Sequence, residues 1–119
     1  MPDFQGRDRE FRDFGTRIRN GITQGADFCG RHKVIQFGCG TGCSSVFVAD
    51  VSTGQVFRFP HGGEYDQMLP LQYRLSSNLI RAWWLQNSDS MGECLQEDLL
   101  FKDSQFTSLG KSASALCPR

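Results

Sequence analysis

The 119-residue sequence lacks a net charge and a long apolar segment, and it holds only four prolines. Thirteen basic and thirteen acidic residues cancel, so we expect no long-range attraction to nucleic acid or to an anionic membrane surface. No apolar run approaches the roughly 20 residues that cross a bilayer, which argues against membrane insertion. Zero net charge also lowers repulsion between molecules, and this favours a protein partner or self-association.

The first residues also lack a basic stretch followed by an apolar one, the pattern of a secretory leader. We therefore expect a cytoplasmic protein, or a periplasmic or exported one if a leader precedes this chain. The cysteines are numerous for a cytosolic domain of this size and favour an oxidising compartment. Their odd number leaves at least one thiol without a partner in the chain. They are Cys29, Cys39, Cys43, Cys94 and Cys117.

The length is that of a single domain, 1–119, which can form a core without a metal or a disulfide. Ten Phe, two Trp and two Tyr make that core aromatic. We expect residues 1–6 and 110–119 to be mobile tails, because the last segment is rich in Ser and Ala.

Residues 6–21 are predicted to form the only helix. Phe11, Phe14, Ile18 and Ile22 recur at steps of three and four, which places them on one face. Arginines alternate with acidic residues on the other faces. We expect these to form ion pairs along a solvated face, and the alternative is a nucleic-acid contact.

After Gly25 the apolar period changes from helix-like to strand-like. The segment 45–51 is apolar on both faces, as a central strand requires, and Gly54 is suited to close the hairpin turn that follows it. The residues between Pro60 and Pro70 are expected to form a loop. Strands are predicted at 31–37, 45–51, 55–59, 71–75, 79–85, 94–101 and 105–109. The expected fold is α+β: one N-terminal amphipathic helix packed on a twisted, mainly antiparallel sheet of about five to seven strands.

Three segments occur in an order typical of a family of small bacterial proteins of uncharacterised function. They are GCGTGC at 38–43, DVSTGQV at 50–56 and YRLSSNL at 73–79. The chain resembles this family over residues 14–101, although Ser76 and Asn78 replace the usual Asp and Arg of the third segment. The resemblance implies kinship and fold, and its members are often exported, but it implies no activity.

The GCGTGC segment is also the most informative local feature for chemistry. Its glycines suit a tight loop, and we take Gly40, Thr41 and Gly42 as binding candidates. Cys39 and Cys43 are candidates for a disulfide across that loop. A phosphate-binding loop is disfavoured, because a strand rather than a helix is expected to follow.

A thiol- or zinc-dependent site is the more specific alternative for these cysteines. Cys29, His32, Cys39 and Cys43 are four candidate zinc ligands within fifteen residues, although their spacing is not that of a common zinc knuckle. A cysteine–histidine nucleophile has the residues it needs but no surrounding signature. His61 is expected in an exposed loop. The acidic residues Glu93, Glu97, Asp98 and Asp103 are expected on the solvated surface.

Trp83 and Trp84 are adjacent and therefore point to opposite faces of their predicted strand. One is expected beneath the helix, and the other exposed beside Arg81, as an anchor for a partner. With no catalytic set and no expected cofactor, the sequence favours a non-enzymatic protein-binding domain, of the kind found among inhibitors and immunity proteins.

Overall fold

The computed structural model describes residues 1–40, 43–61, 66–67, 69–86 and 94–114. The expected α+β class is confirmed. A short 3-10 helix, η1 (Arg9–Phe14), leads into α1 (Gly15–Thr23). The strands follow as β1 (His32–Gly40), β2 (Cys43–Asp50), β3 (Val56–Arg58), β4 (Asp66–Gln67), β5 (Leu71–Gln72), β6 (Leu79–Gln86), β7 (Cys94–Lys102) and β8 (Gln105–Ser114). In the described part of the chain, no helix has the length and apolar character to cross a membrane.

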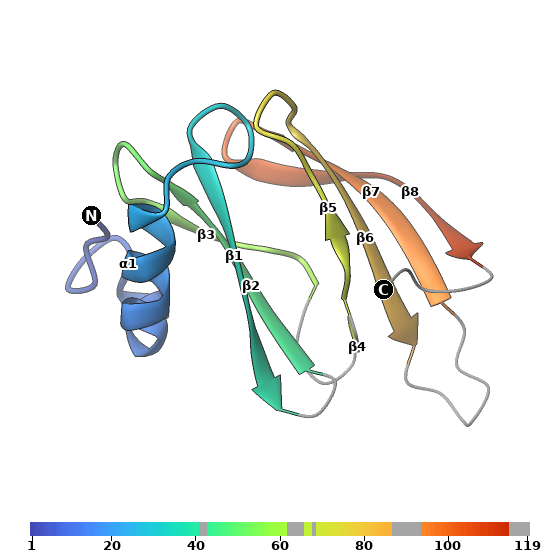
Figure 1. The fold of residues 1–119 in the computed structure, drawn as a ribbon, viewed down its shortest axis with the longest axis horizontal. Coiled ribbons are helices and arrows are strands. Elements are labelled where there is room, and N and C mark those ends of the chain that lie inside the picture. Colours follow the sequence, from blue (N-terminus) through green and yellow to red (C-terminus); the bar gives the residue numbers. More distant parts are fainter. Residues whose placement is uncertain (41–42, 62–65, 68, 87–93, 115–119) are drawn as a thin grey trace.

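The strands form two antiparallel sheets, not the single sheet expected. The first sheet has the order β1-β2-β3, and the second has the order β4-β6-β7-β8 with β5 paired to β6. Figure 1 shows three layers: α1 covers one face of the first sheet, and the second sheet covers the other. This arrangement explains why the segment 45–51 is apolar on both faces. Most of the segment belongs to β2, which is the central strand of the middle layer.

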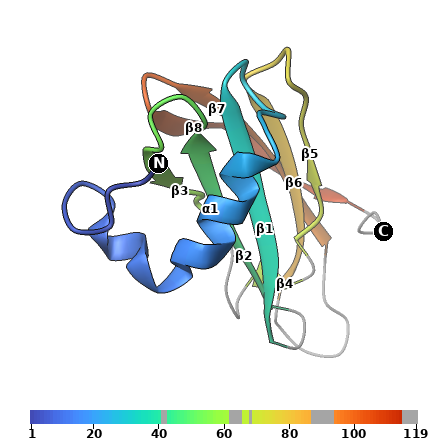
Figure 2. The same cartoon turned by 60° about the vertical axis from the view of Figure 1, so that its left-hand side comes forward.

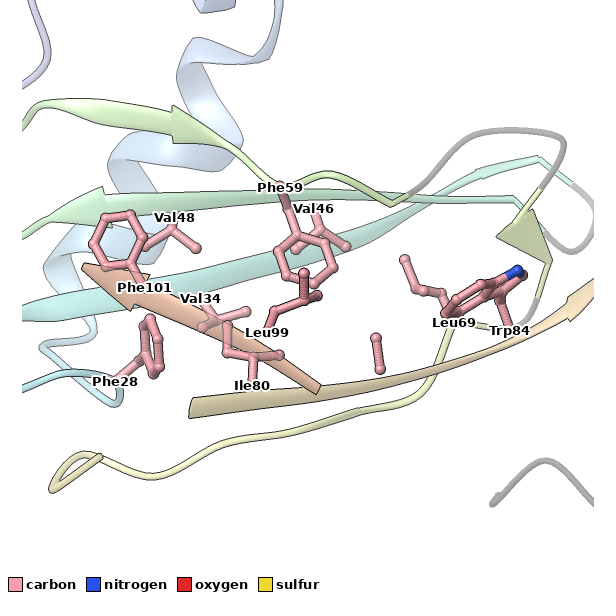
Figure 3. Packing of buried hydrophobic residues seen from close by; sticks show 11 residues of the cluster. Phe28, Val34, Val46, Val48, Phe59, Leu69, Ile80, Trp84, Leu99 and Phe101 are labelled. Carbon is pink, nitrogen blue, oxygen red and sulfur yellow. The ribbon is translucent and has the colours of Figure 1, made fainter. Parts of the chain in front are cut away.

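Two hydrophobic clusters separate the three layers. The cluster between α1 and the first sheet contains Phe4, Phe11, Ile18, Ile22, Ile35, Phe47, Ala49 and Val56. The cluster between the sheets is larger (Figure 3) and contains Phe28, Val34, Val46, Val48, Phe59, Leu69, Ile80, Ala82, Trp84, Leu99 and Phe101. Alternate residues of β2 therefore contribute to different clusters.

The N-terminal helix is shorter and less regular than predicted. The chain changes from 3-10 to α geometry at Gly15, where a Cβ would lie 3.3 Å from the Phe4 ring. Among the described residues, no ion pair joins side chains three or four apart on this helix. Instead the Arg17 guanidinium lies 5.0 Å from the centre of the Phe37 ring, and that of Arg19 lies 4.9 Å from Phe4. Aromatic rings thus take the place of the expected acidic partners.

The structure also differs from the sequence prediction at the ends of the chain. Phe4 is buried in the helix cluster, so the segment 1–6 is packed against the domain. β8 continues to Ser114, well into the segment 110–119 that was expected to be a tail, because it pairs with β7 along its length. In the other direction, the strand predicted at 71–75 is reduced to the two residues of β5.

The turn between β2 and β3 follows the prediction. Gly54 has a φ of 80°, and Asp50 Oδ1 accepts hydrogen bonds from the backbone N–H groups of Ser52 and Thr53 at 2.8 and 3.2 Å. Burial alone would raise the pKa of Asp50. The hydrogen bond from the Ser52 hydroxyl, the two backbone bonds and Arg31 outweigh burial and hold the pKa below its usual value.

Candidate functional site

The outer edge of β1 is the first feature of interest. The N–H of Val51 donates to the carbonyl of Arg31 at 2.8 Å, so the odd-numbered residues of β1 exchange backbone hydrogen bonds with β2. The N–H and C=O groups of His32, Val34 and Gln36 therefore point away from the first sheet. β1 is an edge strand, since β2 is its only neighbour among the described strands.

Part of this edge is already closed. The backbone groups of His32 exchange hydrogen bonds with those of Phe28, at 2.8 and 2.9 Å, and the N–H of Val34 donates to Asp27 Oδ1 at 2.9 Å. Beyond the N–H of Val34, no described residue bonds to the outward backbone groups of β1. The carbonyl of Val34 and both backbone groups of Gln36 are the central open positions.

An open groove of about 510 Å³ runs along this edge. One wall comes from α1, which crosses over β1 in Figure 2. Tyr73 contributes from the side of the second sheet. The lining consists of Arg17, Asn20, Gly21, Gln24, Lys33, Val34, Ile35, Gln36, Phe37 and Tyr73. Five of these are consecutive in β1, so the groove follows the strand rather than a single side chain.

The groove is polar and carries cations. Among the described residues, no Asp or Glu belongs to its lining, whereas Arg17 and Lys33 do. The Nζ of Lys33 lies 2.8 Å from Asp27 Oδ2, which offsets that charge. Burial and then the nearby Asp27 carboxylate raise the pKa of Tyr73, so its hydroxyl stays protonated at neutral pH.

The outer face of the second sheet holds two of the predicted binding residues. Arg81 lies opposite Asp98 on the neighbouring strand, and its Nε donates to Asp98 Oδ1 at 2.7 Å. This bond raises the pKa of Arg81 and lowers that of Asp98, whose side chain is only partly exposed. The Nε1–H of Trp83 donates to Gln96 at 2.9 Å. Both candidates are half-buried, and their polar ends are already bonded within the sheet.

Trp84 points the other way, as the alternation predicted, but it does not pack beneath the helix. It is 5% exposed and lies in the cluster between the two sheets. The helix covers only the first sheet, so neither tryptophan reaches it. Trp84 is therefore part of the core and does not present a binding surface.

The four residues of the predicted zinc site are not brought together. Cys29 and His32 line a pocket of about 280 Å³ at one end of the two sheets. β1 then runs extended from His32 to the backbone of Cys39, seven residues further along, a distance of about 23 Å. The described residues contain no group of three or more His, Cys, Asp or Glu side chains suited to a metal ion.

Within that pocket, Cys29 is a free, half-buried thiol with a φ of 51°. His32 is 8% exposed, and its Nδ1 has no hydrogen-bond partner among the described residues. Burial lowers the pKa of His32, so its ring is neutral at pH 7.

Within the GCGTGC segment, residues 38–40 end β1, and Gly40 pairs with Cys43 at the start of β2. A strand does follow the loop, as expected, because β2 begins at Cys43. Thr41 and Gly42 lie outside the described residues. The side chains of Cys39 and Cys43 do too, so the disulfide stays a prediction.

A buried polar cluster between the sheets was not predicted from the sequence. Glu97 was expected at the surface but is only 3% exposed. Its carboxylate forms a hydrogen bond with His61. His61 was expected in an exposed loop, but its side chain is only 10% exposed. Ser108 Oγ donates to the other carboxylate oxygen at 2.6 Å, and the His61 ring stacks on Trp84 at 4.2 Å between centroids.

Comparison of the chain with protein-family models, with curated proteins and with solved structures finds no match. The resemblance to a family of small bacterial proteins therefore stays a prediction.

Proposed function

We propose that this protein is a binding module that takes an extended segment of another protein as an additional strand on β1. The observation that carries the proposal is the open groove along an edge strand, where five consecutive residues from Lys33 to Phe37 form the floor and α1 forms a wall. Strand addition of this kind supplies main-chain hydrogen bonds for affinity and side-chain contacts for selectivity.

The composition of the edge supports this proposal. Exposed edge strands invite pairing with other chains, and proteins usually protect them with charged residues, proline or a covering segment. The segment from Val34 to Gly40 contains neither a charged residue nor a proline. Within the described ranges, only the first part of β1 is covered, by Asp27 and Phe28. The remaining backbone groups are available to a partner strand, and each hydrogen bond contributes about 0.5–1.5 kcal/mol net.

Selection from a phage-displayed library of random linear peptides tests this function, with Gln36→Pro as the decisive variant. Proline removes the outward N–H of residue 36, and an edge strand tolerates it because that N–H has no partner inside the sheet. Gln36→Thr is the matched control. It keeps the N–H but, like the proline, loses the side-chain hydrogen bond from Gln36 Nε2 to the carbonyl of Leu69 at 2.7 Å.

We expect selected peptides to bind the wild type and Gln36→Thr, and to lose binding to Gln36→Pro, whose circular dichroism should match that of the wild type. Amide chemical-shift changes at Gln36 and Gly38 on peptide addition check the site in the wild type itself. Equal binding to all three proteins, shifts elsewhere, or no enriched peptide would contradict strand addition at β1.

A thiol-dependent site at Cys29 and His32 is the second candidate. It is favoured by the unpartnered Nδ1 of a buried, neutral histidine in the same pocket as a free thiol. Zinc analysis of the purified protein and of Cys29→Ser tests it, since bound zinc that is lost in the variant would favour this site. The intact mass measured with and without reductant shows whether the cysteines are free or joined in disulfides. A disulfide-bonded form would favour an oxidising compartment.

A further inference from the structure

We infer that the segment bound on β1 is acidic, with a side-chain carboxylate held by Arg17. This inference rests on the proposed strand addition and names the chemistry of its partner. The side chains of an incoming strand alternate, so every second one faces the α1 wall, where Arg17 lies.

Arg17 is held in place before a partner arrives. Its guanidinium carbon lies 5.0 Å from the centre of the Phe37 ring, in a cation–π contact that orders an otherwise mobile side chain. The guanidinium has five N–H donors, and none of the described residues accepts a hydrogen bond from Arg17, so these donors remain available to other groups. Those donors form a planar fork that matches the two oxygens of a carboxylate.

In addition, no carboxylate of the described residues neutralises the charge of Arg17. It takes part in none of the ion pairs of the described residues, whereas Lys33 is paired with Asp27 and Arg81 with Asp98. No carboxylate of the residues that the structure describes lines the groove, and the amides of Asn20 and Gln24 beside Arg17 add neutral donors. Arg17 is therefore the cation of this groove best placed to select an acidic partner.

Three synthetic heptapeptides with blocked termini test the inference. All alternate valine with a second residue, which is glutamate, glutamine or lysine, and the blocked ends remove the terminal carboxylate. Fluorescence anisotropy measures their dissociation constants. We expect the glutamate peptide to bind about fivefold more tightly than the glutamine peptide, as one partly exposed charge pair allows. That preference should vanish near 1 M salt, where the Debye length is about 3 Å.

Variants of two arginines on the same helix assign the effect to one side chain. Arg17→Gln should abolish the preference for glutamate. Arg17→Lys should weaken it, because an ammonium lacks the planar fork. Arg19→Gln removes the same charge from α1 but leaves the groove unchanged, since Arg19 stacks on Phe4 and is not in the lining. This control should keep the full preference.

The outcomes separate the two proposals. If the glutamate and glutamine peptides bind equally and both lose binding to Gln36→Pro, strand addition stands and the acidic preference is wrong. If Arg19→Gln reduces the preference for the glutamate peptide as much as Arg17→Gln does, the assignment of this preference to Arg17 is wrong. If none of the three peptides binds the wild type, both proposals are overturned.

Discussion

His61 and Glu97 connect the two sheets through a hydrogen bond between an imidazole nitrogen, Nε2, and a buried carboxylate oxygen, Oε1. His61 lies shortly after β3, the last strand of the first sheet, and Glu97 lies in β7 of the second. The carboxylate also accepts a hydrogen bond from Ser108, and the imidazole stacks on Trp84. The pair therefore fixes the chain at the point where it leaves one sheet for the other.

Glu97→Gln should destabilise the fold by about 1–3 kcal/mol, because the amide removes the charge and replaces one acceptor by a donor inside the core. Urea unfolding measures the difference. Glu10→Gln is the control, since Glu10 pairs with Arg58 on the surface, where its side chain is 62% exposed. Surface pairs of this kind contribute at most about 1 kcal/mol. Equal losses in the two variants would show that the buried carboxylate adds no more than an exposed one.

The same residue predicts a dependence of stability on pH. Burial alone would raise the pKa of Glu97, but the hydrogen bonds from Ser108 and His61 outweigh it and hold the pKa below its usual value of 4.5. A carboxyl whose pKa is lower in the folded state stabilises the fold above its unfolded pKa. That contribution is lost as the pH falls below about 4.5 and through the folded pKa. The free energy of unfolding should therefore fall less steeply with acid in Glu97→Gln, and equal slopes in the two proteins would contradict this.

This cluster was beyond sequence reasoning for a physical reason. His61 sits in a Pro- and Gly-rich segment and Glu97 in an acidic one, and both contexts are typical of solvated surface. Only tertiary structure brings together two residues that are 36 positions apart. The groove was missed likewise, because period-two patterns give the faces of a strand but not which strand forms an edge.

Local periodicity did predict which residues of a strand share a face and which strand is central. The alternation through β6 placed Trp83 and Trp84 on opposite faces, as observed, and the two-sided apolar pattern of 45–51 marked a central strand. What covers each face is not encoded locally. The first sheet takes the place over Trp84 that was expected for the helix, because two apolar sheet faces pack as well as a sheet and a helix do.

Gly21→Ala should loosen the packing of α1 on the first sheet. A Cβ at this position would lie 2.6 Å from Ile35 Cγ1, which is too close for two carbon atoms, and Ile35 is itself buried. Overpacking of this kind costs about 1–3 kcal/mol, which thermal unfolding measures. Asn20→Ala is the matched control on an exposed position of the same helix, where alanine favours helix formation. A stable Gly21→Ala would mean that Ile35 moves without cost.

Asp8→Asn should release the N-terminal segment from β3. Asp8 is 1% exposed, and its carboxylate accepts hydrogen bonds from the backbone N–H groups of Val56 and Asp3, at 3.0 and 2.9 Å, and from the Arg7 guanidinium. These bonds outweigh the effect of burial and hold the pKa of Asp8 below its usual value of 3.8. In asparagine, an NH₂ group replaces one of the two carboxylate oxygens, so a hydrogen-bond donor would face the N–H donors that now bond to Asp8.

We expect a loss of about 1–3 kcal/mol in Asp8→Asn, together with faster amide exchange at Val56. Asp13→Asn on the exposed face of η1 is the control for the charge change and should stay within about 0.5 kcal/mol of the wild type. Unchanged exchange at Val56 in Asp8→Asn would contradict a role in holding β3.

The two tryptophans of β6 should respond very differently to truncation. Trp84→Ala removes a ring that is 5% exposed and packed between the sheets, so a loss of about 3–5 kcal/mol is expected in urea unfolding. Trp83→Ala removes a half-buried ring on the outer face and its hydrogen bond to Gln96, which together contribute less. Both variants remove one indole, so they are matched in size and chemistry. A larger loss for Trp83→Ala would mean that the apolar core lies on the opposite face of the second sheet, and the three-layer arrangement would then be wrong.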